Sequence, residues 1–218
     1  RANGYARGDG VGALTLDGRD CAEGTCCVVQ CAVRCDGRSA SLTAPNGTAQ
    51  TNMIKAALGT ASLKRLDLIE AHGTGTSLGD PTEAGALAAV HSSMNDTTRV
   101  VVGAAKASVG HSEAPSGQVG LLRASAVIDG LTASGNAQLR SLNPLVGERL
   151  GSSTDCFTLP MQPVASRLVC GVSSFGYSGT IAHLLQHVMM ATKDAGQLTP
   201  SLSYERQTMP VSYTHLRA

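Results

Sequence analysis

Two histidines and one lysine lie beside glycine-rich loops, and side chains of these types can take part in catalysis. His72 stands in EAHGTGTSLGDPTEAGAL, between an apolar run and alternating glycines and threonines. Lys106 and His111 stand in AAKASVGHSEAPSG, after the next apolar run. Glycine beside each histidine lets the backbone approach a ligand closely. A third loop, SSFGYSGTIAH, carries a tight glycine turn, and the three loops are candidates for one shared pocket.

Each of these residues also has a purely structural interpretation. A histidine that stands alone more often belongs to the core or the surface, and we interpret His91, His187 and His215 in that way. Lys106 is equally compatible with a solvated surface charge. Glu113 is compatible with an acid that favours the first turn of the following helix. Position alone does not decide between the two interpretations.

Apolar periodicity predicts the elements that must position these residues. Short apolar runs predict strands, and apolar residues at helical spacing predict helices. The last predicted helix has a thin polar face, so we expect it to be buried on most sides. The predicted strands cover 11–16, 26–33, 66–71, 99–105, 167–174 and 180–188, and the predicted helices cover 49–58, 82–92 and 116–129.

The strongest local signal lies at the start of the helix over 82–92. Asp80, Pro81 and Glu83 form the pattern of an N-cap, a proline at the first helical position and a capping box. This helix joins two strands in a βαβ unit, which predicts parallel pairing. Ligands of open α/β sheets bind beyond the carboxyl ends of the strands. The three loops follow such strand ends and should therefore meet.

The composition is that of a soluble globular domain or of a piece of one. The 218 residues are 42% hydrophobic and 15% charged, with a net charge of +1. The sequence has no basic stripe, which argues against nucleic acid as a partner, and no apolar run that spans a membrane. It also lacks an initiator methionine and a signal-peptide core. We therefore expect a fragment of a longer cytoplasmic protein, with organelle targeting left open.

The cysteines do not predict a metal site. Five of the seven lie within residues 21–35, at spacings that do not match zinc-binding motifs. We interpret them as small buried apolar side chains in a reducing compartment. The sequence also lacks a phosphate-binding Walker A motif, the HExxH zinc motif and the GxSxG nucleophile elbow.

Five segments together resemble the second half of β-ketoacyl synthases, most closely the ketosynthase domain of type I polyketide and fatty-acid synthases. Besides the three loops, they are NGYARGDGVGALTL and DGRSASLTAPNGTAQ, in the same order as in the family. The resemblance implies an α/β, thiolase-like fold, in which two similar halves build a five-layered α-β-α-β-α core. Residues 1–190 are then the C-terminal half, and 191–218 are a polar tail.

The resemblance also implies a reaction and its partners. The family performs a decarboxylative Claisen condensation between an acyl group on a cysteine and a malonyl-type extender. No cofactor is bound, because the substrates are carried on the phosphopantetheine arm of an acyl carrier protein. The family is usually homodimeric, and here the dimer contact would involve the missing half. The acyl carrier protein is thus the expected partner, and polyketide or fatty-acid biosynthesis the expected pathway.

The family's catalytic roles can be carried over to four residues. By this resemblance, His72 and His111 are neutral imidazoles that donate hydrogen bonds to the thioester oxygen during decarboxylation. Lys106 matches the family's lysine, which pairs with the glutamate matching Glu113. That pairing would fix the local charge and the orientation of the histidines.

The binding roles can be carried over in the same way. Thr74 and Thr76 match threonines that hydrogen-bond the pantetheine arm. Phe175 matches a gating phenylalanine near the acyl chain, and the turn at Gly176 contributes a backbone N–H to the oxyanion site. Tyr177 stands where the family has a smaller residue, which narrows the acyl channel.

Several alternatives remain open. The family's nucleophilic cysteine lies in the first half, and none of the cysteines here has its T-A-C-S-S context, so the chain alone is expected to be inactive and poorly soluble. A non-condensing module that docks a carrier protein or only decarboxylates is the main alternative. A thiolase or chain-initiating relative is disfavoured by the presence of both histidines. A serine hydrolase that uses Asp80 is disfavoured by the missing elbow.

Overall fold

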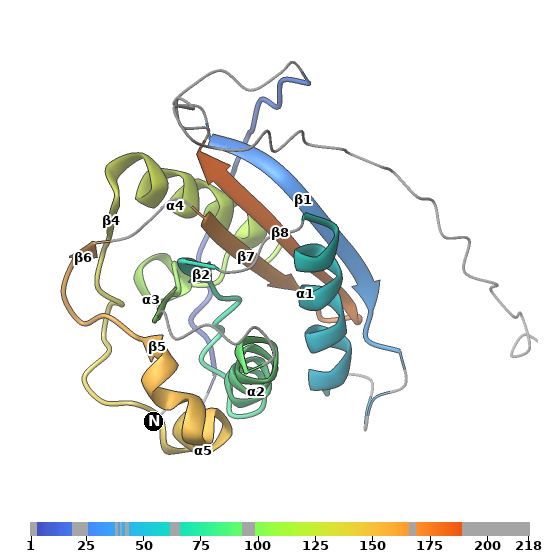
Figure 1. Cartoon of the computed structure of the whole chain (residues 1–218), viewed down its shortest axis with the longest axis vertical. Coiled ribbons are helices and arrows are strands. Elements are labelled where there is room, and N and C mark those ends of the chain that lie inside the picture. Colours follow the sequence, from blue (N-terminus) through green and yellow to red (C-terminus); the bar gives the residue numbers. More distant parts are fainter. Residues whose placement is uncertain are drawn as a thin grey trace, which may run out of the picture.

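The fold is built on a mixed six-stranded sheet with helices on both faces (Figure 1). The computed structural model describes residues 4–18, 26–37, 39, 41, 44–61, 66–92, 99–165 and 169–188. The predicted tail, 191–218, lies outside these residues. The order of strands in the sheet is β1 (Cys26–Cys35), β8 (Thr180–Val188), β7 (Val169–Phe175), β2 (Leu68–Glu70), β3 (Val100–Gly103) and β5 (Phe157–Thr158).

The central strands of this sheet are parallel. β2 pairs in parallel with β3 on one side and with β7 on the other, and β5 continues the parallel part beyond β3. β8 runs antiparallel to both β7 and β1. The carboxyl ends of β7, β2 and β3 therefore lie next to one another at one edge, as the βαβ pattern predicts. A second sheet joins β4 (Thr132–Ala133) to β6 (Val164–Ala165).

The helices cover the two faces unequally. α1 (Gly47–Ala61) and α2 (Gly79–His91) lie on one face, with α5 (Pro144–Leu150) packed on α2 and followed by the 3-10 helix η1 (Gly151–Cys156). α4 (Ser116–Gly130) covers the other face, and the short α3 (Lys106–Val109) leads towards it (Figure 1).

The core is split by the sheet into two apolar layers. Successive strand residues face opposite sides, so Leu68 belongs to the layer under α4 and Ile69 to the layer under α1 and α2. Met53 and Ile54 of α1 are completely buried in the second layer. The observed α-β-α layering agrees with the predicted α/β class.

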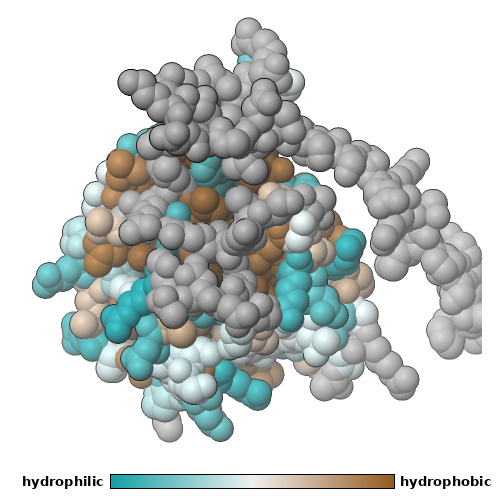
Figure 2. Space-filling view, in the orientation of Figure 1, coloured by the Kyte–Doolittle hydropathy of each residue, from teal (hydrophilic) through white to brown (hydrophobic). Residues whose placement is uncertain are grey.

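Two local predictions are wrong. The segment 11–16 is not a strand, and its Val11 and Leu16 are 102% and 76% exposed. α4 buries one face, including Ala124 and Ile128, but leaves Leu122 46% exposed, so it is not enclosed on most sides. Figure 2 shows apolar surface gathered over the upper half of the molecule, around α4 and the sheet.

The cysteines also depart from the prediction of small buried thiols. Cys170 fits it, since it is completely buried and burial raises the pKa of its thiol. Cys31 and Cys35 are exposed on β1, and Cys27 is disulfide-bonded. Ala32 of β1 packs in the layer under α1, so the alternating Cys31 and Cys35 point to the opposite face of the sheet, where they are exposed.

Candidate active site

The loops that follow β2, β3 and β7 bring the two predicted histidines together. The ring centroids of His72 and His111 lie 5.5 Å apart with an interplanar angle of 87°. The ring of Phe175, at the end of β7, lies 5.2 Å from that of His72. The two imidazoles thus face one region although 39 positions (111 − 72) separate them in the sequence.

Backbone hydrogen bonds select the same tautomer for both histidines. The N–H of Phe175 donates to Nδ1 of His72 at 3.3 Å. The N–H of Glu113 donates to Nδ1 of His111 at 3.1 Å. Because Nδ1 is an acceptor in both rings, the proton of each neutral imidazole resides on Nε2. Each ring therefore offers one Nε2–H donor.

Burial favours the neutral form of both rings. It lowers the pKa of His72 to about 3, with further contributions from the charges of Lys106 and His111. The pKa of His111 is also lowered, first by burial and then by Lys106, while Glu113 opposes the shift. A buried imidazole loses the hydration that stabilises its cation, so the neutral, donating form is favoured.

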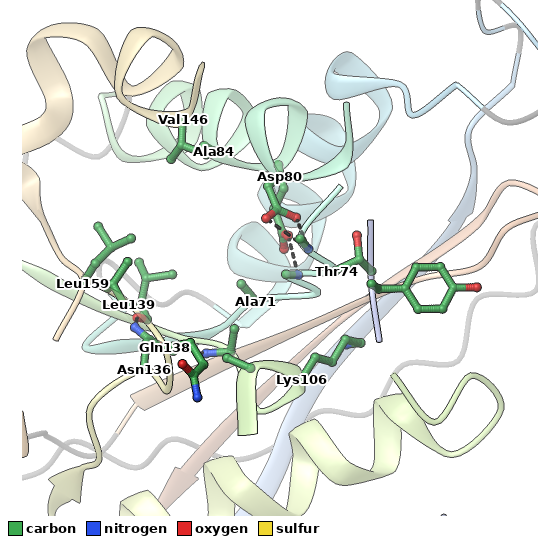
Figure 3. Close-up of a pocket in the computed structure, with 18 of the residues that line it drawn as sticks. Ala71, Thr74, Asp80, Ala84, Lys106, Asn136, Gln138, Leu139, Val146 and Leu159 are labelled. Carbon is green, nitrogen blue, oxygen red and sulfur yellow. Dashed lines mark hydrogen bonds between the residues drawn. The ribbon is translucent and has the colours of Figure 1, made fainter. Parts of the chain in front are cut away.

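Two acids from α2 hold the loop that carries His72. The carboxylate of Glu83 accepts from the N–H of His72 at 2.8 Å and from the N–H of Gly73 at 2.9 Å. The carboxylate of Asp80 accepts from the N–H of Gly75 at 3.0 and 3.1 Å, and Figure 3 shows this reach. Burial raises the pKa of Glu83 to about 7, although both N–H donors lower it.

The predicted capping box at the start of α2 is therefore wrong. The helix begins at Gly79, and its N-cap residue, Leu78, makes no side-chain capping bond. Asp80 and Glu83 turn back to the glycine-rich loop instead of capping their own helix. The loop offers several N–H groups in one place, and these compete with the helix end for the same carboxylates.

Glycine is required in this loop by backbone geometry. Gly73 has a φ of 44°, and a Cβ there would lie 2.8 Å from the Cβ of Ala104. The hydroxyls of Thr74 and Thr76 lie 3.2 Å apart, and Thr76 also accepts from the N–H of Gly79 at 3.0 Å. The loop is thus a compact turn whose two threonine hydroxyls lie together.

The predicted pairing of Lys106 with Glu113 is wrong. Burial lowers the pKa of Lys106, and the carboxylates that raise it are Glu83, Glu70 and Asp80. Glu113 instead forms an ion pair with Arg7 at 3.3 Å. Lys106 still acts on both histidines, because its charge disfavours their protonation.

The loop that carries Lys106 has its own buried anchor. The N–H of Ala105 donates to Oε1 of Glu70 at 2.5 Å, and Glu70 also forms an ion pair with Arg123 of α4. The Glu70 side chain is 2% exposed, and burial raises the pKa of its carboxyl. This buried pair ties the ends of β2 and β3 to α4.

Residues 4–8, which we call the strap, bridge the two histidine loops. The N–H of Gly4 donates to the carbonyl of Gly75 at 3.2 Å. The N–H of His111 donates to the carbonyl of Ala6 at 2.8 Å, and the N–H of Gly8 donates to the carbonyl of His111 at 3.1 Å. The strap therefore fixes the backbone of His111 from both sides.

Side chains of the strap also reach His111 and its neighbour. The ring of Tyr5 lies 4.8 Å from that of His111, edge to face. The hydroxyl of Tyr5 donates to Oε1 of Glu113 at 3.3 Å, the same oxygen that pairs with Arg7. Glu113 has a φ of 55°, a left-handed conformation uncommon for a residue with a side chain.

Two cavities open on either side of this arrangement. The larger, of about 1020 Å³, is lined by seven of the eight predicted site residues: His72, Thr74, Thr76, His111, Glu113, Phe175 and Gly176. The smaller, of about 480 Å³, is mostly apolar and is lined by Lys106. Figure 3 shows Leu139 and Leu159 on one side of the smaller cavity and Lys106 and Thr74 on the other.

Backbone hydrogen bonds shape the turn after β7, where a backbone N–H near Gly176 was predicted to serve an oxyanion. The N–H of Phe175 donates to His72, and the N–H of Gly176 donates to the carbonyl of Thr180 at 2.7 Å. These two bonds position the His72 ring and close the turn, and the predicted oxyanion role of the turn remains a prediction. Tyr177 is 83% exposed and lines the larger cavity.

The described part of the chain contains no cysteine nucleophile at this site. None of its cysteines lines either cavity. No group of three or more potential metal ligands is found among the described residues. Within the same residues, no helix has the length and apolar character needed to cross a membrane.

Sequence analysis missed the residues that hold the two histidines. The sequence pattern places Glu83 and Asp80 at the helix start and indicates no role for Tyr5 and Arg7. One signal was present for the acids, since both follow a loop with several consecutive N–H groups that need acceptors. No local signal connects Arg7 to Glu113, because the pair is formed only by the fold.

Comparison with known proteins gives a consistent result. The family model "Beta-ketoacyl synthase, C-terminal domain" matches residues 25–138. The chain is 37% identical over 197 residues to the highly reducing polyketide synthase ACTTS3 of Alternaria alternata, covering 84% of this chain and 8% of that protein. It is 38% identical over 204 residues to the highly reducing polyketide synthase cm3B of Cordyceps militaris, covering 89% of this chain and 8% of that protein. The chain thus spans less than a tenth of these two relatives.

Solved structures similar to this one are ketosynthases. The ketosynthase from module 6 of the bacillaene synthase of Bacillus subtilis 168 matches with a TM-score of 0.68 and 25% identity, covering 74% of this chain and 30% of that one. The oxazolomycin ketosynthase domain OzmH KS7 of Streptomyces albus JA3453 matches with a TM-score of 0.67 and 30% identity. The match covers 74% of this chain and 29% of that one.

Proposed function

The chain belongs to the β-ketoacyl synthase family and has its thiolase-like fold, and from this premise we propose that it supplies the decarboxylation half of a condensing site. The reaction is a decarboxylative Claisen condensation of an acyl thioester with a malonyl-type thioester. The substrates are carried on the phosphopantetheine arm of an acyl carrier protein, which is the partner. The chain works with a second thiolase-like half.

The observation that carries this proposal is the pair of neutral imidazoles. His72 and His111 lie 5.5 Å apart, and backbone bonds to Nδ1 leave the proton of each ring on Nε2. When a malonyl thioester loses CO₂, the electron pair of the broken C–C bond moves into an enolate, whose oxygen bears the negative charge. Two aligned donors stabilise that oxygen.

The rest of the step follows from the charge balance. The enolate carbon attacks the carbonyl of the acyl thioester, and this forms the new C–C bond. The C–S bond of the acyl thioester breaks, and the sulfur leaves as a thiolate. Neutral histidines suit this role better than cations, because a neutral imidazole is too weak an acid to protonate the enolate that it stabilises. Thr74 and Thr76 line the same cavity and are proposed to bind the arm.

The acyl-carrying nucleophile is proposed to come from sequence outside these 218 residues. No described cysteine lines the cavity, and burial raises the pKa of both Cys26 and Cys170, which keeps these thiols protonated. Dimer formation through the other half is proposed by analogy with the family, which is usually homodimeric.

The direct test replaces His111 by alanine in the intact protein. Decarboxylation of a malonyl-carrier protein should fall by about 100- to 1,000-fold, because one oxyanion donor is lost. Loading of the acyl group on the cysteine should survive, which is checked by intact mass spectrometry. Unchanged decarboxylation by the variant would refute the donor role.

A second candidate is a module that decarboxylates without condensing. The specific observation in its favour is that the larger cavity contains no described cysteine. Mass spectrometry of the intact protein after incubation with an acyl-carrier protein separates the two functions. A stable acyl adduct supports condensation, and decarboxylation without any adduct supports the alternative.

A further inference from the structure

One end of the larger cavity carries two acceptor oxygens that have no hydrogen-bond partner. They are Oε1 of Gln50 and Oδ1 of Asp36, and both residues line the cavity that contains His72 and His111. Gln50 is 1% exposed, so its amide cannot turn to bulk water. The Asp36 oxygen is buried although the residue as a whole is half-buried.

The start of α1 places these two oxygens. The side-chain oxygen Oδ1 of Asn46 accepts a hydrogen bond from the N–H of Ala49 at 3.1 Å and so caps the helix. The side-chain amide of Asn46 donates to the carbonyl of Asp36 at 2.8 Å, which ties the end of β1 to the helix start. The N–H of Gln50 donates to the carbonyl of Asn46 at 3.0 Å, so Gln50 lies one turn further on the same side.

The chemistry of these groups defines what they can bind. A buried acceptor that has lost its water is unfavourable unless another group donates to it. The carboxyl of Asp36 already accepts a hydrogen bond from the backbone N–H of Asn46, so Oδ1 is the oxygen that still needs a donor. An apolar chain end or a ligand carboxylate would leave both oxygens unsatisfied. A hydroxyl or an amide N–H would satisfy them.

We propose that Gln50 and Asp36 form a subsite that binds a hydrogen-bond donor carried by the thioester ligand. Two parts of such a ligand can supply this donor: a hydroxyl on the acyl chain, or an amide N–H of the carrier arm. The proposal rests on the proposed function, because it assumes that thioesters enter this cavity. Gln50 then helps to determine which ligands the site prefers.

The experiment measures dissociation constants by isothermal titration calorimetry on the intact protein. Three non-hydrolysable probes are used, each with a methylene in place of the thioester sulfur so that no new donor is added: a butanoyl-pantetheine analogue, its 3-hydroxybutanoyl counterpart, and the butanoyl analogue with its arm amides N-methylated. If the hydroxyl is the donor, the second probe should bind about tenfold more tightly than the first. If an arm amide is the donor, the third should bind about tenfold more weakly.

The variant Gln50→Leu removes the buried acceptor at nearly constant volume. Whichever tenfold difference is seen should shrink to about twofold or less. Gln186→Leu is the matched control, because Gln186 is 3% exposed, also has an unpartnered Oε1 and does not line the cavity. It should keep the difference. Asp36→Asn, which turns one acceptor into a potential donor, provides a second variant if Gln50→Leu does not fold.

The outcomes separate this inference from the proposed function. If the wild-type protein binds none of the probes, the proposed function fails. If it binds all three equally, or if both subsite variants keep the preference, the subsite inference fails while the proposed function stands. Loss of the preference in Gln50→Leu or Asp36→Asn, with retention in Gln186→Leu, supports the subsite.

Discussion

The loops that carry the two histidines are held in place by different means. The loop of His72 is held from the interior, by a Glu83 side chain that is 5% exposed. The loop of His111 is held from the surface, by the strap and by an ion pair whose Arg7 and Glu113 side chains are 79% and 53% exposed. The His72 loop thus depends on the buried carboxyl group of Glu83. The His111 loop depends mainly on backbone hydrogen bonds to the strap.

This difference predicts which supports are sensitive to substitution. A buried acceptor that satisfies two backbone donors cannot be replaced by water, so its loss is expensive. An exposed ion pair is screened by solvent and contributes little. The strap should therefore act through its backbone and its close approach to His111, and only weakly through Arg7.

The largest stability effect is expected from Glu83→Ala. It leaves the N–H groups of His72 and Gly73 buried without an acceptor, at roughly 1–3 kcal/mol each, so the free energy of unfolding should fall by roughly 2–6 kcal/mol. Urea denaturation measures it. Glu148→Ala, at an exposed position on α5, is the control. Equal stability of the two variants would show that Glu83 does not hold the loop.

The pH dependence of stability should reveal the same buried acid. Burial raises the pKa of Glu83 from 4.5 to about 7, so between these values the unfolded chain has lost a proton that the folded chain retains. Stability from Glu83 is therefore present below pH 4.5 and declines as the pH rises to 7, by up to about 1.4 kcal/mol per pH unit.

His72 gives stability the opposite pH dependence, and this contribution cancels when wild type is compared with Glu83→Gln. Its pKa is lowered from 6.5 to about 3, so its contribution is present above pH 6.5 and is lost as the pH falls towards 3. Wild type and Glu83→Gln both contain His72, so both keep its contribution. The difference in unfolding free energy between wild type and Glu83→Gln should decline from pH 4.5 to 7, and a constant difference would contradict the raised pKa.

Gly8→Ala tests the backbone part of the strap. A Cβ at Gly8 would overlap the carbonyl oxygen of Val109, so the strap must move away from the His111 loop. Overpacking of this kind lowers stability by about 1–3 kcal/mol. Gly18→Ala is the control, because nothing lies near its added Cβ. NMR of the imidazole nitrogens should show the change at His111 and leave His72 unaffected.

Arg7→Met should have the smallest effect, below about 1 kcal/mol, because the ion pair with Glu113 is exposed. Thermal unfolding at low and high salt measures it, and the small difference from wild type should vanish at high salt. A loss as large as that of Gly8→Ala would mean that the side chain, rather than the backbone, carries the strap.

The general position of the site was predictable from the sequence, since parallel strands end at one edge of a sheet. That rule brings the loops of His72, His111 and Phe175 together, as the structure has them. The thiolase-like fold followed from the resemblance of five segments and is shared with the solved ketosynthases.

The partners of individual side chains were not predictable in the same way. The acids of α2 fit a capping box locally, and only the folded loop shows that its N–H groups take both carboxylates. Lys106 and Glu113 are close in sequence but face different cavities. The segment 11–16 is a short apolar run like those of the strands, but it pairs with no described strand, so its pattern was misleading.

The strap has a consequence for the order in which the protein folds. Tyr5 and Glu113 are 108 positions apart, whereas the contacts of the His72 loop with α2 lie 10 and 11 positions apart. Contacts between distant residues form later than local ones, because a long loop must first be closed. The backbone of the His72 loop is thus fixed early, within its own βαβ unit, whereas the His111 loop is completed only when residues 4–8 pair with it.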